Sequence, residues 1–165
     1  MGFWKNLWNR RAPPLTPLHA IVEGAEVRVG GAVEALELLT DPTSGRQAVA
    51  IDYLAKVPGA LDQIYPGLLG DGARSVYRLH KATPFLLRGD DMCVRIDPPS
   101  EQGDLDTLHD RLQDQFGLHL HAEVNLIQIA ERVEVEGVVE SVELRDPRRG
   151  VPWRATIRAT RLWTP

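Results

Sequence analysis

The feature that most constrains the fold is a sustained alternation of apolar and polar residues in the last third of the chain. The stretches "HAEVNLIQIAERVEVEGVVESVEL" (121–144) and "PWRATIRATRLW" (152–163) change polarity at nearly every residue. Successive side chains of a β-strand point to opposite faces, so a period of two predicts strands with one buried and one solvated face. We therefore expect a mainly β protein whose sheets bury their apolar sides.

Three segments further upstream also carry strand signals. Residues 19–39 alternate on either side of Gly30 and Gly31, which predicts two strand pieces around a turn or bulge. Residues 47–57 predict an apolar strand, and residues 75–99 predict two strands joined by a turn at 89–91. Residues 58–73 hold four glycines and two prolines, which favours a loop.

The clearest helix signal lies at residues 103–117, "GDLDTLHDRLQDQFG". Asp104 is well placed as the N-cap, and Gly117 can end the helix in a left-handed conformation. Apolar residues recur at spacings of three and four, as on a helix that packs against a sheet: Leu105, Leu108, Leu112 and Phe116. Strands and helix together predict an OB-like antiparallel barrel crossed by one internal helix. We find no internal repeat, so residues 17–165 are expected to form one barrel domain, preceded by a separate segment at 1–16.

The first residues, "GFWKNLWNRR", predict an amphipathic N-terminal helix, which we call the leader. Its apolar side at helical spacing is formed by four residues: Phe3, Trp4, Leu7 and Trp8. Three cations lie among them: Lys5, Arg10 and Arg11. A helix of about ten residues is marginal in water, so the leader needs an apolar surface to fold against. That surface is either its own domain, a partner protein or the interface of an anionic membrane, for which tryptophan beside lysine and arginine is the usual composition.

The formal net charge of −4 hides a segregation of charge along the chain. Residues 1–16 carry +3 and residues 145–165 carry +5, which leaves −12 for residues 17–144. Five C-terminal arginines, close to Trp153 and Trp163, form a candidate site for an anionic ligand: Arg148, Arg149, Arg154, Arg158 and Arg161. Nucleic acid, lipid headgroups or an acidic protein would suit such a row, but a solvated strand face needs no ligand at all. The acidic centre of the chain argues against a nucleic-acid-binding protein.

Candidate catalytic and metal sites are scarce in the sequence. On a strand, His119, His121 and Glu123 would share one side, and two imidazoles with a carboxylate can bind zinc. A regular solvated face explains the same alternation, so a metal-dependent enzyme is the lesser alternative. The single cysteine, Cys93, lies among apolar residues and is expected in the core. The sequence contains no nucleophile-elbow or phosphate-loop motif, so we expect no enzyme activity and no cofactor.

Localisation and partners follow from the same residues. The sequence has neither the apolar core of a secretory signal nor the roughly 20 apolar residues that span a bilayer. We therefore expect a cytoplasmic protein, peripheral on the inner face of a membrane where the leader binds lipid. The partners that we expect are another protein or assembly, an anionic membrane surface and a second copy of the chain.

Three phrases of the sequence carry a resemblance to a known family. They are "GAVEALELLTDPTSGRQAVAIDY", then "TPFLLRGDDMCVRIDPP", then "IAERVEVEGVVESVE". In this order they resemble the GIDE-type domain, also called the beside-a-membrane domain. That domain stands next to the RING finger of membrane-anchored ubiquitin ligases and occurs without the RING in bacterial proteins. The match covers Gly31 to Tyr53, Thr83 to Pro98 and Glu131 to Val139.

The chain departs from that family in three respects. "RGDDM" replaces a D-x-T-G turn, the two flanking transmembrane helices are missing, and one cysteine cannot build a RING. Ligase activity is therefore not implied. The resemblance implies a β-rich binding or scaffolding module that works at or near a membrane, with the leader in place of the missing anchors.

Overall fold

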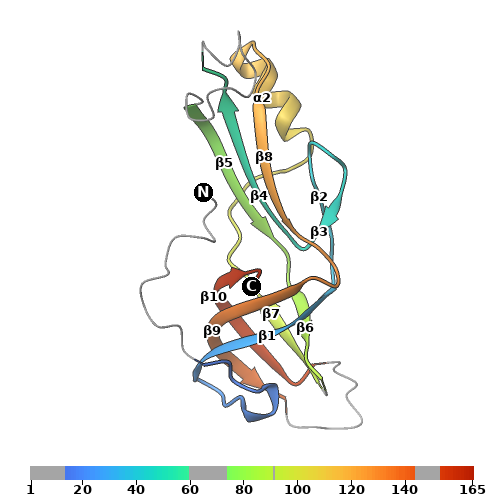
Figure 1. Cartoon of the computed structure of the whole chain (residues 1–165), viewed down its shortest axis with the longest axis vertical. Helices are drawn as coiled ribbons and strands as arrows, with labels where there is room; N and C mark the ends of the chain where they lie inside the picture. Colours follow the sequence, from blue (N-terminus) through green and yellow to red (C-terminus); the bar gives the residue numbers. More distant parts are fainter. Residues whose placement is uncertain (1–13, 60–73, 91, 144–152) are drawn as a thin grey trace.

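The computed structural model describes residues 14–59, 74–90, 92–143 and 153–165. The molecule is elongated, with a closed five-stranded barrel at one end and a three-stranded sheet covered by a helix at the other (Figure 1). The predicted mainly β class with one internal α-helix is confirmed.

Five strands build the barrel: β1 (Glu26–Ala35), β6 (Phe85–Arg88), β7 (Cys93–Asp97), β9 (Arg132–Val142) and β10 (Ala155–Trp163). They are ordered β1-β6-β7-β10-β9, and β9 closes the barrel by pairing with β1. The β7–β10 pair is parallel and the other four pairs are antiparallel. The barrel is therefore OB-like, as predicted, although it is not wholly antiparallel.

The predicted alternation explains the barrel core. On β10, Ala155, Ile157 and Ala159 are buried, whereas Arg158 and Arg161 are exposed. A register shift between Ala159 and Arg161 keeps the strand's apolar residues inside, because it lets the next inward position fall on Leu162. Strands β1 and β9 also alternate buried apolar residues with less buried ones, whereas β6 and β7 each have consecutive buried residues.

The expected turn at Gly30 and Gly31 is wrong, because β1 runs through both glycines without a break. Residues 26–32 of β1 pair with β9, and residues 32–35 pair with β6. A Cβ on Gly31 would lie 2.5 Å from the carbonyl oxygen of Arg88, so this position must be a glycine for β6 to approach. Close strand approach, rather than chain reversal, explains the glycine.

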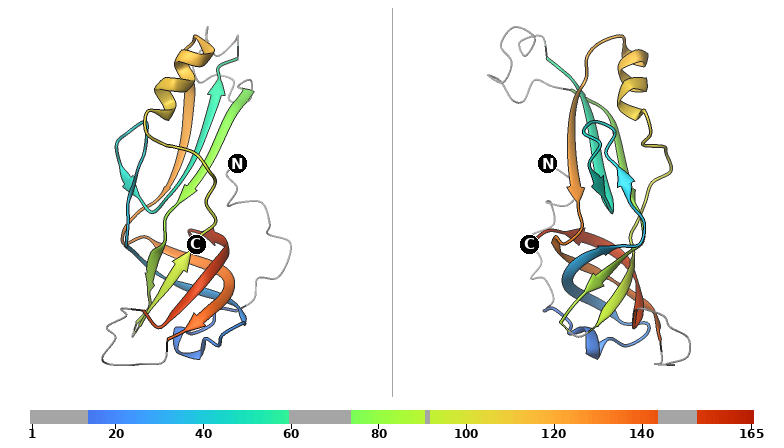
Figure 2. Two further views of the ribbon diagram at one scale, coloured as in Figure 1. Left: turned by 180° about the vertical axis from the view of Figure 1, so that it is seen from behind. Right: turned by 90° about the vertical axis from the view of Figure 1, so that its right-hand side faces the viewer.

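A second sheet, ordered β5-β4-β8, lies beyond the barrel and was not predicted (Figure 2). It consists of β4 (Ala50–Val57), β5 (Arg74–Ala82) and β8 (His121–Ile127). The short strands β2 (Leu39–Thr40) and β3 (Gln47–Ala48) form a ribbon before β4. The helix α2 (Leu108–Phe116) packs on this sheet, and together they enclose a hydrophobic cluster separate from that of the barrel.

Two stretches that each looked like one strand pattern are divided between the two sheets. Residues 75–88 break at Thr83 and Pro84 into β5 of the second sheet and β6 of the barrel. Residues 121–142 break at a turn in which Ala130 has a φ of +67°, between β8 and β9. Alternation shows which residues share a face, but it carries no information on which sheet receives them.

The helix is shorter at its start than predicted. Its N-cap is Thr107 rather than Asp104, whose side chain instead accepts a hydrogen bond from the Asp106 amide in the preceding turn. Gly117 ends the helix with a φ of +65° and donates to the Gln113 carbonyl, as predicted. Leu108 and Leu112 are buried against the sheet, but Phe116 remains 39% exposed.

Candidate functional site

The chain enters the barrel through a segment that is firmly attached to it. The Thr16 amide donates to the Arg28 carbonyl at 2.6 Å, on a part of β1 that pairs with β9 on its other side. The 3-10 helix η1 (Leu18–Ala20) follows, and Leu18 packs where Gly89 leaves space for its side chain. Leu18 and Ile21 both belong to the barrel core. Any surface that holds residues 1–13 is therefore linked to the barrel by this short attachment.

The leader residues lie outside the described part of the chain. This applies to the apolar set and the cations alike: Phe3, Trp4, Lys5, Leu7, Trp8, Arg10 and Arg11. Their helix, and the surface that it contacts, stay predictions. In the described residues no helix has the length and apolar character needed to cross a bilayer.

The C-terminal arginine row is matched by glutamates of β9. Arg158 pairs with Glu140 at 3.3 Å, and Arg161 pairs with Glu136 at 3.5 Å. Arg148 and Arg149 lie outside the described residues. Where it is described, this strand face therefore presents ion pairs, as a solvated face balanced by acidic neighbours would.

A third ion pair extends this pattern onto β1. Arg28 donates from Nε to Glu134 at 2.9 Å, and its guanidinium lies 5.4 Å from the ring centroid of Trp163. The arginine thus packs on an aromatic ring while its charge is paired. Sequence analysis missed Arg28 because it lies more than 130 residues before Trp163, and only barrel closure brings them together.

Arg154 stands apart from the other arginines. Its amide donates to the Cys93 carbonyl at 2.8 Å, and its Nη1 lies 3.7 Å from the Met92 sulfur. Nearby, the Arg95 guanidinium lies 5.5 Å from the ring centroid of Trp153 and donates to Asp97. The row predicted from sequence is therefore split between two places on the barrel surface.

The metal candidate from the sequence is not assembled as a ligand set. His119, His121 and Glu123 are all exposed, and Glu123 pairs with Lys56 of the neighbouring strand. The hydrogen bond from Lys56 is the main reason why the pKa of Glu123 lies below its usual value. In the described residues no group of three histidine, cysteine, aspartate or glutamate side chains is placed to hold a metal ion.

Cys93 is buried, as predicted, at 5% exposure. Burial raises the pKa of its thiol, which disfavours the reactive thiolate. His109 makes a specific contact that the sequence did not predict: its Nδ1 lies 2.8 Å from the hydroxyl of Tyr53. This bond connects helix α2 to the fully buried Tyr53 of β4.

A buried polar cluster joins β4 to β5 where the chain returns from the second sheet to the barrel. Asp52 and His80 are register partners and both are buried. Arg78 donates to the two carboxylate oxygens of Asp52 at 3.1 and 2.9 Å. His80 Nε2 lies 3.1 Å from the Pro99 carbonyl, and burial lowers the pKa of its imidazole. Sequence analysis missed this cluster, since the residues are adjacent only once β4 and β5 pair.

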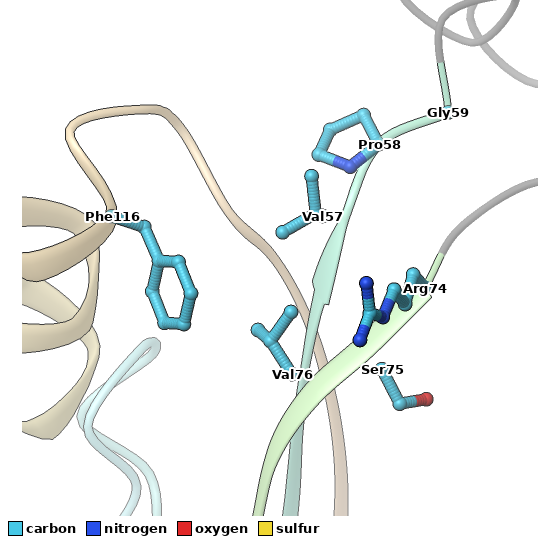
Figure 3. A pocket seen from close by; sticks show the side chains of 7 residues that line it. All are labelled: Val57, Pro58, Gly59, Arg74, Ser75, Val76 and Phe116. Carbon is cyan, nitrogen blue, oxygen red and sulfur yellow. The ribbon is translucent and has the colours of Figure 1, made fainter.

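An open hollow of about 530 Å³ lies at the far end of the second sheet (Figure 3). Phe116 of α2 faces Val57 and Val76 across it, and Arg74 and Pro58 stand at its border. Its lining includes Gly59 and Arg74, the described residues on either side of the undescribed range 60–73. We assign it no ligand.

The three phrases on which the predicted resemblance to the GIDE-type domain rests occupy defined places in the fold. The first covers the end of β1 through β4, the second β6 and β7, and the third most of β9. Asp41, in the first, organises a turn by accepting hydrogen bonds from Thr43 and Ser44. Burial alone would raise the pKa of Asp41, but these bonds outweigh it and the pKa is lowered.

Comparisons of the chain with protein-family models, curated proteins and solved structures found no match.

Proposed function

We propose that this chain is a non-enzymatic interaction module that its leader attaches to an anionic membrane surface. The observation that carries the proposal is the leader composition, "GFWKNLWNRR", directly ahead of a segment that is packed into the barrel. Four apolar residues would enter the headgroup region, and three cations would contact anionic lipid. Each cation would contribute about 1 kcal/mol to binding. The barrel and the second sheet would then be held close to the surface.

Two further points support this function. The resemblance to the beside-a-membrane domain implies the same location for a β-rich module. Three side chains of the alternative candidate sites have partners within the protein: Arg158 and Arg161 in ion pairs, and Glu123 with Lys56. We therefore favour membrane attachment over nucleic-acid binding and over a metal-dependent enzyme.

Co-sedimentation with vesicles containing anionic lipid tests the proposal. The full chain is compared with a chain beginning at Leu15 and with the double variant Trp4→Ala, Trp8→Ala. Both changes are expected to abolish most binding, because the first removes the leader and the second removes the two largest side chains of its apolar side. The matched control is Asn6→Ala, Asn9→Ala, which changes the polar side of the same segment and should bind like the parent.

Equal sedimentation of the full chain and of the chain beginning at Leu15 would overturn membrane attachment through the leader. If a protein partner retains the chain without vesicles, and this retention needs Trp4 and Trp8, the leader binds a partner protein instead of lipid. High salt should weaken binding to anionic vesicles, since it screens the contribution of the leader cations.

A further inference from the structure

The two edge strands of the second sheet, β5 and β8, differ in whether another described segment covers them. At the β5 edge, the Glu101 amide donates to the His80 carbonyl at 2.9 Å, and the Glu101 carboxylate accepts from the His80 amide at 2.7 Å. The Ala82 amide donates to Ser100 Oγ. Residues 99–101 therefore cover this edge, as proteins commonly do to prevent further strand pairing.

The β8 edge has no such cover within the described residues. β8 pairs with β4 along all seven of its positions without a register shift, and it is the outer strand of the sheet (Figure 1). It contains no proline or glycine, and no bulge bends it away. A regular edge of this length offers a row of peptide groups to another strand.

The side chains of β8 divide cleanly between its two faces. His121, Glu123 and Asn125 are exposed on the face away from α2. The alternate residues are only partly buried and extend the second hydrophobic cluster to the edge: Ala122, Val124 and Leu126. A strand added to β8 would thus need an apolar face in phase with these three residues.

We propose that β8 pairs antiparallel with β8 of a second copy of this chain, around a two-fold axis at Val124. In an antiparallel pair, residues directly opposite each other lie on the same face of the sheet. A two-fold axis perpendicular to the sheet must therefore lie midway between the two copies of a single residue. Centring it on Val124 pairs all seven residues. Val124 then faces its own copy, and each Ala122 faces a Leu126 on the α2 side.

The exposed face favours the same register. With the axis at Val124, each Glu123 lies opposite an Asn125 of the other copy, which can donate a hydrogen bond to the carboxylate. An axis at Glu123 would place two glutamates opposite each other, which is unfavourable. The result is one continuous six-stranded sheet with both α2 helices on the same side. The second hydrophobic clusters of the two copies would then be adjacent across the β8–β8 pair.

Cysteine cross-linking of the full chain tests the register directly. In Val124→Cys the two cysteines would face each other with Cα atoms roughly 4.5–5.5 Å apart, within disulfide range. In the matched control, Ala122→Cys, they would lie four residues apart along the pair, roughly 13 Å, which a disulfide cannot bridge. Mild oxidation should therefore give a covalent dimer of the first variant only. The parent chain serves as background, since Cys93 is buried.

Sedimentation velocity across low to high micromolar concentrations gives a second, independent measurement. Asn125→Glu would place two pairs of glutamates opposite each other and should raise the dimer dissociation constant about tenfold. Asn125→Lys places lysine opposite Glu123 and should not weaken the dimer. Circular dichroism checks that both variants keep the parent fold.

Three results would overturn the proposal. One is a monomer at all concentrations with no cross-link in Val124→Cys. Another is equal cross-linking of Val124→Cys and Ala122→Cys, which would exclude this register. The third is a dimer that is indifferent to the sign of the charge at position 125, which would place the interface elsewhere.

Discussion

Tyr53 shows how one hydrogen bond secures the helix to the second sheet. Its hydroxyl is buried beneath α2 and has His109 Nδ1 as its partner. In Tyr53→Phe the ring keeps its packing but the bond is lost, and the imidazole nitrogen must find water instead. We expect a loss of about 1 kcal/mol in the free energy of unfolding, measured by urea titration at neutral pH.

The same residue predicts a dependence on high pH. Burial is the main reason why the pKa of Tyr53 is raised to about 12 from its usual 10.0. A group whose pKa is raised by folding contributes stability that is present below pH 10.0 and lost as the pH rises toward 12. The stability gap between the parent and Tyr53→Phe should therefore shrink between these values. A constant gap would show that Tyr53 does not titrate in this range.

Gly30 and Gly31 are adjacent yet have different roles. A Cβ on Gly31 would meet the Arg88 backbone at 2.5 Å, whereas a Cβ on Gly30 would make only ordinary contacts, the nearest at 3.6 Å. Gly31→Ala should destabilise the protein by about 1–3 kcal/mol, because β1 and β6 must move apart. Gly30→Ala should be neutral or slightly stabilising, since glycine is unfavourable within a strand. Thermal or urea unfolding of the two variants distinguishes them.

At the scale of elements, the Asp52–Arg78 pair holds β4 and β5 together near the barrel. Asp52 is 3% exposed, while the Arg78 side chain is 41% exposed, so the carboxylate bears the desolvation cost. Arg78→Met removes two charge-assisted hydrogen bonds from a buried carboxylate and should cost about 2 kcal/mol. Arg158→Met breaks a surface pair with Glu140 and should change stability by less than about 0.5 kcal/mol. Similar losses in both variants would contradict this distinction.

At the scale of the whole molecule, the two hydrophobic clusters predict two units of local stability. Leu112 is buried in the second cluster and has no part in that of the barrel. Leu112→Ala should cost about 2–5 kcal/mol locally and expose amides of α2 and the second sheet to faster hydrogen exchange. Amides of the β1–β9–β10 ladder should keep the protection of the parent. Uniform acceleration across both parts would show that they open as one unit.

Dimerisation through β8 would strengthen membrane attachment through the leader. If the leader attaches the protein to a membrane as we propose, a single leader would be a weak and reversible anchor, because one short amphipathic helix buries little apolar area. A dimer through β8 would carry two leaders, and simultaneous binding raises the apparent affinity without any new contact. The barrel would supply the rigid link between each leader and the sheet through which the copies associate.

The features that could be predicted from the sequence are those determined by residues close together in the chain. Local sequence predicted three features that depend on neighbours within a few residues. Alternation predicted the strand faces of β9 and β10, apolar neighbours predicted the core position of Cys93, and Gly117 predicted the C-terminal end of α2. The OB-like class followed from the number and spacing of such segments. The candidate site was predicted less well: the leader came from local composition and stays a prediction, and the arginine row gave no hint of its glutamate partners.

The sequence by itself determined which side chains need burial, since polarity at each position is a property of the residue. Only the tertiary structure decided where each strand pairs. In the folded protein β5 and β6 belong to different sheets, β1 continues through two glycines, and Asp52 is the register partner of His80. These outcomes depend on backbone hydrogen bonds between segments far apart in the chain, and such bonds are alike for every residue type except proline. Pairing is therefore selected by the packing of whole faces, which no local pattern contains.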